Sequence, residues 1–383
     1  MQARNESCDA LLTLVSIGSY DSCVKKLGTF GPNEIGLYPR SMADTSGAGP
    51  YPNRRLVLAQ RPAGMIDEAT VRVEEAPAPS PGDGEALVRV RYLSIDPTIR
   101  TWMNDVHGYL PPIALGEVVR SVGIGEVVES RSERYEVGDL LYGMTGWQDY
   151  ALASEAMNRM QKVPPGLDPP VVLNVFGITG MTAYFGLFDV GKVATGDAVV
   201  VSGAAGATGS TAGQIAKIAG AKLVVGIAGS TEKCAFITDE LGLDAAINYK
   251  TDDVGERLHE LFPDGIDLYF DNVGGDILDA CLARLALHGR IVLCGAIASY
   301  NDTKRPTGPS NYRYLITRRG RMEGFIILDY ADRYPEAQAA IAGWMAEGKL
   351  RHVEHIVHGL EQAPEALNML FTGANTGKVV VEL

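Results

Sequence analysis

Residues 199–209 have the pattern of a nucleotide-binding loop. Their sequence, VVVSGAAGATG, is a short apolar run followed by closely spaced small residues, and helical spacing begins directly afterwards. Gly206 and Gly209 fill the second and third glycine positions of the G-x-G-x-x-G pattern, and Ala204 stands at the first. Glycines at these positions let a pyrophosphate approach bare backbone N–H groups at a helix N-terminus. The pattern predicts dinucleotide binding, and the alternative is a tight strand-to-helix turn without a ligand.

The end of the next predicted strand indicates which dinucleotide is bound. Enzymes that use NAD often have Asp or Glu there, which holds the ribose 2′-OH. Here the chain continues as Ile-Ala-Gly-Ser at residues 227–230, and Lys233 follows three residues later. A cation without a carboxylate suits a 2′-phosphate and predicts NADPH, with Tyr249 at the following strand end as a further donor. The alternative for Lys233 is a solvated lysine in the first turn of a helix.

The ends of the fourth and fifth predicted strands are also candidates for ligand contact. The fourth is followed by DNVGG at residues 271–275, and the fifth by CGAI at residues 294–297. In a parallel sheet both segments lie at the carboxyl edge, where ligands bind. Cys294 could serve as a reactive thiol, but no histidine is near it in the sequence. This favours a small residue that packs against the backbone.

The histidines at first suggest a metal site. His352, His355 and His358 repeat at every third residue. On an extended strand, however, His352 and His355 face opposite ways, and His352 and His358 lie about 20 Å apart. A catalytic zinc needs about three N, S or O ligands and a structural zinc needs four. We therefore predict that no metal is bound.

The elements that must position these motifs form two patterns. Between residues 55 and 175, short strands are interrupted by Pro and Gly, and the glycines within residues 118–129 predict a curved, partly closed sheet with bulges. From about residue 176, strands alternate with helices, which predicts an α/β fold with a Rossmann-type doubly wound parallel sheet. In that part and beyond it we expect helices at residues 210–219, 231–241, 254–262, 276–287, 335–347 and 364–370, and strands at residues 198–202, 222–228, 245–249, 267–272, 290–295, 323–328 and 378–383.

These patterns predict how the chain is divided. We expect a flexible N-terminal extension at residues 1–53, a β-rich catalytic domain at residues 54–175 and 330–383, and a dinucleotide-binding Rossmann domain at residues 176–329. The extension is rich in Ser, Gly, Asn and Pro and has no sustained period; its alternative role is a docking arm. Met42 opens a segment typical of an ordinary N-terminus, so residues 1–41 could come from an upstream start.

Composition excludes several other classes of protein. The chain has 383 residues, of which 46% are hydrophobic and 21% charged, as in a globular protein of two or three domains. A net charge of −13 disfavours nucleic acid or an anionic membrane as the main partner. No apolar stretch approaches the roughly 18 residues of a membrane span. Five scattered cysteines do not form a disulfide framework, so we expect a cytoplasmic protein.

From about residue 55 to residue 383, the chain resembles zinc-independent medium-chain dehydrogenases/reductases. Within them it is most similar to the NADPH-dependent double-bond reductases, a group that includes alkenal, prostaglandin and curcumin reductases. The signatures that carry the resemblance, besides the glycine loop, are SIDP at 94–97 with Arg100, PP at 111–112, GWQDY at 146–150, GMTAYFGL at 180–187, AGSTEK at 228–233, NYK at 248–250, DNVGG at 271–275, CGAI at 294–297 with Tyr300 and Asn301, EGF at 323–325 and GAN at 373–375.

The resemblance implies roles for individual residues. Beside the Rossmann sheet it implies a β-rich, partly closed-barrel (GroES-like) catalytic domain. The residues implied in cofactor binding are Gly206, Ala207, Thr208 and Gly209 at the pyrophosphate, Ser230, Lys233 and Tyr249 at the 2′-phosphate, and Asn272, Cys294, Phe325 and Asn375 along the groove. Tyr300 corresponds to a tyrosine near the substrate carbonyl, and Tyr109 to a second active-site tyrosine of curcumin-type members. Many relatives have Asp-Pro-Tyr-Met-Arg where this chain has Thr98 in place of the tyrosine, so the substrate does not carry over.

The expected activity is NADPH-dependent reduction of a C=C bond conjugated to a carbonyl, with hydride added at the β-carbon. Without zinc, hydrogen-bond donors must stabilise the negative charge on the carbonyl oxygen, and Tyr300 and a cofactor ribose hydroxyl are the candidates. The alternative for Tyr300 is packing against the nicotinamide. A quinone reductase and an NADPH-binding sensor or scaffold are the alternative functions. The expected partners are a small unsaturated carbonyl compound and a second copy of the chain.

Overall fold

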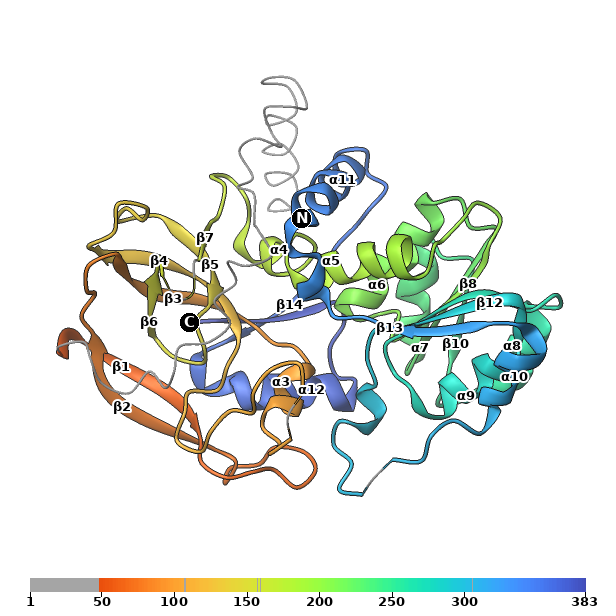
Figure 1. The fold of residues 1–383 in the computed structure, drawn as a ribbon, viewed down its shortest axis with the longest axis horizontal. Helices are drawn as coiled ribbons and strands as arrows, with labels where there is room; N and C mark the ends of the chain where they lie inside the picture. Colours follow the sequence, from red (N-terminus) through yellow and green to blue (C-terminus); the bar gives the residue numbers. More distant parts are fainter. Residues whose placement is uncertain (1–47, 107, 157, 159, 305) are drawn as a thin grey trace. The chain divides into compact units, whose positions relative to one another are not determined.

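The computed structural model describes residues 48–106, 108–156, 158, 160–304 and 306–383. Most of the predicted extension, with Met42, lies outside these residues, but residues 48–53 are not a flexible segment, because they belong to a paired strand that runs from Ala48 to Leu58. The chain forms two compact units (Figure 1). The first comprises the described residues up to Leu173 together with Glu354–Ala374 and Val379–Leu383, and the second comprises Asn174–Val353 together with Asn375–Lys378.

The first unit is rich in antiparallel strands. Its larger sheet has the order β14-β15-β3-β4-β5-β7, with β6 also paired to β3, and β1 and β2 form a separate ribbon. The strands are β1 (Ala48–Leu58), β2 (Val71–Pro79), β3 (Glu85–Ser94), β4 (Val122–Ser130), β5 (Leu140–Met144), β6 (Tyr150–Ser154), β7 (Gln161–Lys162), β14 (Glu354–His358) and β15 (Lys378–Glu382). Its helices are α3 (Thr98–Trp102), α4 (Pro169–Leu173) and α12 (Ala363–Thr372), with a 3₁₀ turn at Leu360–Gln362.

Glycines within β4 allow this sheet to bend. The register between β3 and β4 shifts twice, once between Leu87 and Val88 and again between Val90 and Tyr92. A Cβ atom at Gly125 would lie 2.5 Å from the carbonyl oxygen of Arg89, so the two strands approach more closely than a side chain would permit. The sheet therefore contains the irregular pairing that the glycines in residues 118–129 predict.

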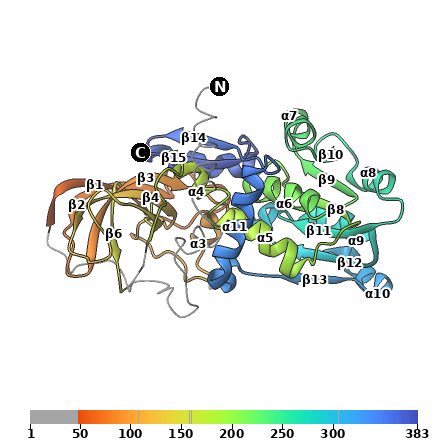
Figure 2. The ribbon, with the colours of Figure 1, turned by 90° about the horizontal axis from the view of Figure 1, so that it is seen from above.

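The second unit is built on a six-stranded parallel sheet. Its order is β10-β9-β8-β11-β12-β13, which can be followed in Figure 2. The strands are β8 (Ala198–Ser202), β9 (Leu223–Ala228), β10 (Ala245–Asn248), β11 (Ile266–Asp271), β12 (Leu285–Leu293) and β13 (Arg321–Gly324). The helices are α5 (Ile178–Phe185), α6 (Ala207–Ile218), α7 (Thr231–Ala235), α8 (Val254–Leu261), α9 (Gly275–Ala283), α10 (Tyr314–Arg318) and α11 (Tyr334–Ala346), and π-helical turns follow α5 at Gly186–Val190 and α7 at Phe236–Glu240.

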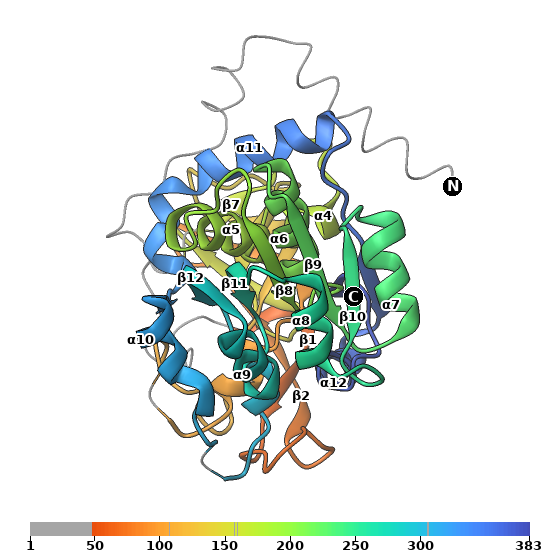
Figure 3. The ribbon, with the colours of Figure 1, turned by 90° about the vertical axis from the view of Figure 1, so that its right-hand side faces the viewer.

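Helices cover both faces of this sheet, as Figure 3 shows. On one face, side chains of α8 and α9 pack with Val200, Val225 and Tyr269 in a single apolar core. On the other face α5 and α6 lie side by side. Parallel strands joined by helices on both faces confirm the predicted Rossmann-type fold beside a β-rich unit.

The division into units differs from our domain boundary at residue 330. Residues 330–353 belong to the second unit. The reason is that α11 packs against α5: the rings of Trp344 and Tyr184 have centroids 6.1 Å apart, and the Gln338 Nε2 donates to the Phe176 carbonyl oxygen at 3.0 Å.

Two expected elements end differently in the structure. The helix expected at residues 276–287 ends at Ala283, and Leu285 already pairs with Ile266 at the start of β12. Leu282 and Leu285 are three positions apart and are both fully buried in the same core. In the sequence they therefore look like two residues on the buried face of one helix. The strand expected at residues 323–328 ends at Gly324, and a 3₁₀ helix follows at Ile327–Arg333. Among the described residues, no helix combines the length and apolar character needed to cross a membrane.

Candidate functional site

The parallel sheet brings most of the predicted site residues to one edge. All neighbouring strands in it run in the same direction, so their carboxyl ends share an edge. The residues that follow these ends are Gly206, Ala207, Thr208 and Gly209 after β8, Ser230 and Lys233 after β9, Tyr249 after β10, Asn272 after β11, Cys294 and Tyr300 after β12, and Phe325 after β13. Asn375 belongs to the same unit, whereas Tyr109 belongs to the first unit.

The glycine loop forms an uncapped helix N-terminus. Gly206 is the N-cap of α6, and no side chain caps this end of the helix. The first backbone N–H groups of a helix have no partner within it, so those of Ala207 and Thr208 are available to an anion. A Cβ atom at Gly209 would lie 2.2 Å from the carbonyl oxygen of Gly203, so only glycine fits there. This cradle fits a pyrophosphate.

A segment distant in the sequence completes the glycine loop. The backbone N–H of Gly377 donates to the Ala205 carbonyl oxygen at 2.8 Å. Asn375, which is 7% exposed, donates from Nδ2 to the Gly377 carbonyl oxygen at 3.1 Å. A Cβ atom at Gly377 would lie 2.0 Å from the Val353 carbonyl oxygen, and its φ is +71°, so this close approach requires glycine. Asn375 is therefore held beside the loop.

The ends of β9 and β10 form a second polar cluster. The Ser230 hydroxyl caps α7 by accepting the Lys233 backbone N–H at 3.2 Å. The Tyr249 backbone N–H donates to the Ala228 carbonyl oxygen at 3.0 Å, and the Tyr249 side chain lies across Gly229. A Cβ atom at Gly229 would be only 2.8 Å from the Tyr249 hydroxyl oxygen. The tyrosine thus occupies the space that an acidic side chain at residue 229 would need.

Two lysines give this cluster a positive charge. Neither Lys233 nor Lys250 forms an ion pair with any residue that the structure describes. Burial, and then the nearby charge of Lys250, lower the pKa of the Lys233 ammonium group below its usual value. A 2′-phosphate dianion would oppose both effects because it places a negative charge beside the ammonium group. The sequence analysis did not select Lys250, although it adjoins Tyr249 in the NYK run.

The segments after β11 and β12 lie on the other side of β8. The Asn272 Nδ2 donates to the Ser202 carbonyl oxygen at 2.7 Å, which ties the end of β11 to the end of β8. The Tyr300 hydroxyl accepts the Ala296 backbone N–H at 3.2 Å, so its ring folds back over its own loop. Desolvation and then the charge of Asp271 raise the pKa of the Cys294 thiol to about 12. The thiol is therefore protonated at neutral pH and is a poor nucleophile.

Phe325 directly follows β13, the last strand of the parallel sheet. A Cβ atom at Gly186, in the π-helical turn after α5, would lie 2.9 Å from the Phe325 ring. The ring also makes an edge contact with Tyr330, with centroids 6.2 Å apart. Glycine is needed at residue 186 because a side chain there would displace Phe325 and also the buried ring of Phe270, which would lie 2.6 Å away.

Tyr109 in the first unit is paired with the residue that departs from the family pattern. The hydroxyl oxygens of Thr98 and Tyr109 are 2.8 Å apart, and either can be the donor. The Tyr109 ring, 48% exposed, makes an edge contact with Trp102 at the end of α3. Although the ring is half exposed, desolvation of the Tyr109 hydroxyl raises its pKa, and the hydrogen bond with Thr98 acts in the opposite direction. Thr98 thus replaces an aromatic ring with a hydroxyl that orients Tyr109.

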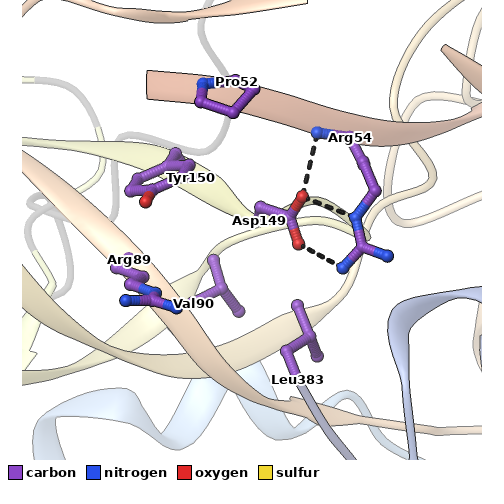
Figure 4. Close-up of a pocket in the computed structure, with 7 residues that line it drawn as sticks. All are labelled: Pro52, Arg54, Arg89, Val90, Asp149, Tyr150 and Leu383. Carbon is purple, nitrogen blue, oxygen red and sulfur yellow. Dashed lines mark hydrogen bonds and ion pairs between the residues drawn. The ribbon is translucent and has the colours of Figure 1, made fainter. Parts of the chain in front are cut away.

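A cavity of about 250 Å³ lies elsewhere in the first unit and contains none of the predicted site residues (Figure 4). Arg54 and Asp149 face each other there, with Nε–Oδ2 and Nη2–Oδ1 distances of 2.9 and 3.0 Å. The Arg54 backbone N–H also donates to Oδ2 at 3.0 Å. This ion pair joins β1 to the residue before β6. Its two charges neutralise each other within the cavity wall.

Comparison with known proteins assigns the chain to a family. Residues 54–163 match the family described as N-terminal domain of oxidoreductase, and residues 207–343 match the family described as zinc-binding dehydrogenase. The chain belongs to the medium-chain dehydrogenases/reductases. Although the second description names zinc, within the described ranges no group of three or more His, Cys, Asp or Glu is arranged to hold a metal ion.

Individual relatives match over most of the chain. The NADPH-dependent curcumin reductase of Escherichia coli (strain K12) is 41% identical over 86% of this chain and 97% of its own. The NADP(+)-dependent 2-alkenal reductase of Nicotiana tabacum is 38% identical with the same coverage. The crystal structure of CurA from Vibrio vulnificus in complex with NADPH is 41% identical, with a TM-score of 0.82 over 86% of this chain and 98% of that chain.

Proposed function

We propose that this protein uses NADPH to reduce the C=C bond of α,β-unsaturated carbonyl compounds, adding hydride at the β-carbon. The observation that carries this proposal is the alignment of the predicted cofactor residues along one sheet edge. The chain is also 41% and 38% identical to a curcumin reductase and a 2-alkenal reductase that use this cofactor.

Three groups of residues would hold the cofactor. The backbone N–H groups at the start of α6 would hold the pyrophosphate, and Lys233 and Lys250 with Tyr249 would hold the 2′-phosphate. Asn272 and the loop after β12 line the half of the groove on the β11 side of β8. When bound, NADPH supplies the hydride. The residues themselves supply position and charge, because they lie on the ends of a rigid parallel sheet.

Tyr300 is the proposed donor to the carbonyl oxygen as that oxygen gains negative charge. Its hydroxyl oxygen accepts the Ala296 backbone N–H at 3.2 Å. A phenol that accepts a hydrogen bond is a stronger donor, since linked hydrogen bonds polarise one another. This interaction is stronger in the transition state than with the neutral carbonyl, so it accelerates the reaction. Tyr109, oriented by Thr98, is the proposed second phenol.

A substrate panel tests this function against its alternatives. Purified protein would be assayed by NADPH oxidation with enals, enones and a quinone, and the products identified by mass spectrometry. We expect saturated carbonyl products from enals or enones. Turnover of the quinone alone would support a quinone reductase. Tight NADPH binding without any turnover would support a sensor or scaffold.

We further propose that the protein acts in the cytoplasm as a homodimer with a small unsaturated carbonyl compound as substrate. β13 is an edge strand of the parallel sheet, and α10, which packs against β12, exposes 76% of Ile316. A second copy would cover both. Light scattering should therefore give twice the chain mass, and Ile316→Glu should shift it toward the monomer. A monomeric parent protein would contradict the proposal.

A further inference from the structure

Asp271 lies where the two halves of the parallel sheet meet. It is the last residue of β11, adjacent to Ser202, the last residue of β8. The chain proceeds outward from β8 in one direction through β9 and β10, and in the other through β11, β12 and β13. Dinucleotides bind across this reversal of strand order, with one mononucleotide on each side. The adenosine half therefore belongs to the β9 side and the nicotinamide half to the β11 side.

One oxygen of the Asp271 carboxyl group collects four hydrogen bonds. Asp271 is fully buried. Its Oδ1 accepts from the Ser202 hydroxyl at 3.1 Å, the Tyr269 hydroxyl at 2.6 Å, and the backbone N–H groups of Val273 and Gly274 at 2.9 Å each. Its Oδ2 is buried without a hydrogen-bond partner among the described residues. Burying a carboxyl group is costly, and the four hydrogen bonds to Oδ1 offset this cost.

The hydrogen bonds to Oδ1 hold the turn at residues 272–274 in place. Two of its four donors are backbone N–H groups of this turn. Gly274 and Gly275 have φ values of +74° and +57°. Because glycine adopts positive and negative φ about equally well, the two residues do not fix this conformation by themselves. Asn272 is fixed from the other side, because its backbone N–H donates to the Ser202 hydroxyl at 3.0 Å. The carboxyl group therefore sets the conformation of the turn that presents Asn272.

The loop that carries Tyr300 is hydrogen-bonded to Asp271 and to this turn. The backbone N–H groups of Cys294 and Gly295 donate to the Asp271 carbonyl oxygen at 2.9 and 3.0 Å. Those of Ile297 and Ala298 donate to the carbonyl oxygens of Asn272 and Val273 at 3.3 and 3.1 Å. A shift of the turn would move this loop, and with it Tyr300.

We infer that Asp271 is a positioning residue for the nicotinamide half of the site. Its carboxylate fixes the turn at residues 272–274, and the turn fixes Asn272 and the Tyr300 loop. The adenosine half, on the β9 side, does not depend on it. This inference rests on the proposed function for the meaning of the nicotinamide half, but its first consequence is a difference in ligand binding.

The substitution Asp271→Asn tests this assignment. The amide oxygen can still accept at the Oδ1 position, but the charge is lost and an NH₂ group enters the Oδ2 position, where no acceptor is described. Loss of charge-assisted hydrogen bonds should weaken NADPH binding by roughly tenfold or more. Binding of adenosine 2′,5′-bisphosphate, which lacks the nicotinamide, should change by less than about twofold. Calorimetry measures both dissociation constants, and stopped-flow mixing measures the single-turnover rate, which should also fall.

Two further variants keep the test decisive. Tyr269→Phe removes one donor to Oδ1 and should act in the same direction more weakly. Tyr135→Phe is the matched control, since it removes a buried phenol that donates to the Met160 carbonyl oxygen in the first unit, and it should leave the ratio of the two constants unchanged.

The inference would be overturned if the folded Asp271→Asn protein had an unchanged ratio of the two dissociation constants, whether both ligands bound more weakly or neither did. If Asp271→Asn does not fold, an unchanged ratio in Tyr269→Phe would do so. If the parent protein binds NADPH but reduces no enal or enone, the proposed function fails, while the ligand ratio still decides the role of Asp271.

Discussion

Replacing Lys233 by alanine should convert a preference for NADPH into near indifference between the two nicotinamide cofactors. Lys233 is partly buried in the first turn of α7, and neither it nor Lys250 has an ion-pair partner in the described part of the chain. The 2′-phosphate would be the anion that neutralises them. NADH lacks this group, so its affinity does not depend on the lysines.

The expected size of the effect follows from the burial of each lysine. A hydrogen bond to a charged group contributes about 1.5–3 kcal/mol, which corresponds to about 10- to 150-fold in the dissociation constant. Lys233 should fall in this range because it is partly desolvated. Lys250 is exposed, and an exposed pair contributes at most about 1 kcal/mol, so Lys250→Ala should weaken NADPH binding by no more than about fivefold.

Calorimetric titration with NADPH and NADH measures the effect directly. Lys222→Ala is the matched control, because Lys222 precedes β9 at the opposite edge of the sheet and pairs with Asp267 at 3.5 Å. It should leave both dissociation constants unchanged. If Lys233→Ala weakens NADPH and NADH equally, the lysine supports the fold of α7 and does not recognise the phosphate. A larger effect from Lys250 than from Lys233 would contradict the ranking by burial.

Four other predictions test separate parts of the site. Tyr300→Phe should slow the single-turnover rate by about 10²-fold or more while NADPH affinity holds, and a full rate would leave the tyrosine as packing. Gly229→Asp should weaken NADPH binding because its side chain must displace Tyr249, and unchanged NADPH affinity would show that the phenol is not a phosphate donor. Deleting residues 1–41 should change neither melting temperature nor turnover, and a loss of several degrees would show that they pack on the core. Elemental analysis of active protein should find far less than one zinc per chain, whereas stoichiometric zinc that is needed for activity would refute a metal-free reaction.

Much of the cofactor site could be predicted from the sequence because its parts are local. The glycine loop, the strand before it and the helix after it are contiguous, and the chemistry of a helix N-terminus requires small residues at fixed spacing. The lack of an acid after β9 and the presence of Lys233 are likewise visible within a few residues. Parallel alternation of strands and helices then implies that all these strand ends share one edge.

Other features depend on contacts between distant residues, which spacing does not reveal. Leu285 has the spacing of a helix residue, but its pairing with Ile266 places it in β12. Gly377 reaches the glycine loop from more than 170 positions away through its hydrogen bond to Ala205, and so places Asn375. Lys250 is selected only by its proximity to Lys233.

Asp271 shows most clearly what the tertiary structure decided. In the sequence it is one residue of a DNVGG run whose neighbours attract attention as groove residues. Its role depends on Ser202 and Tyr269 meeting the same oxygen, and on the Tyr300 loop bonding to the turn beside it. Hydrogen bonds between adjacent strand ends form only when the sheet has assembled in its order. Local sequence therefore determined which groups could bind a dinucleotide, and the packing of β8 against β11 determined which buried group holds them in place.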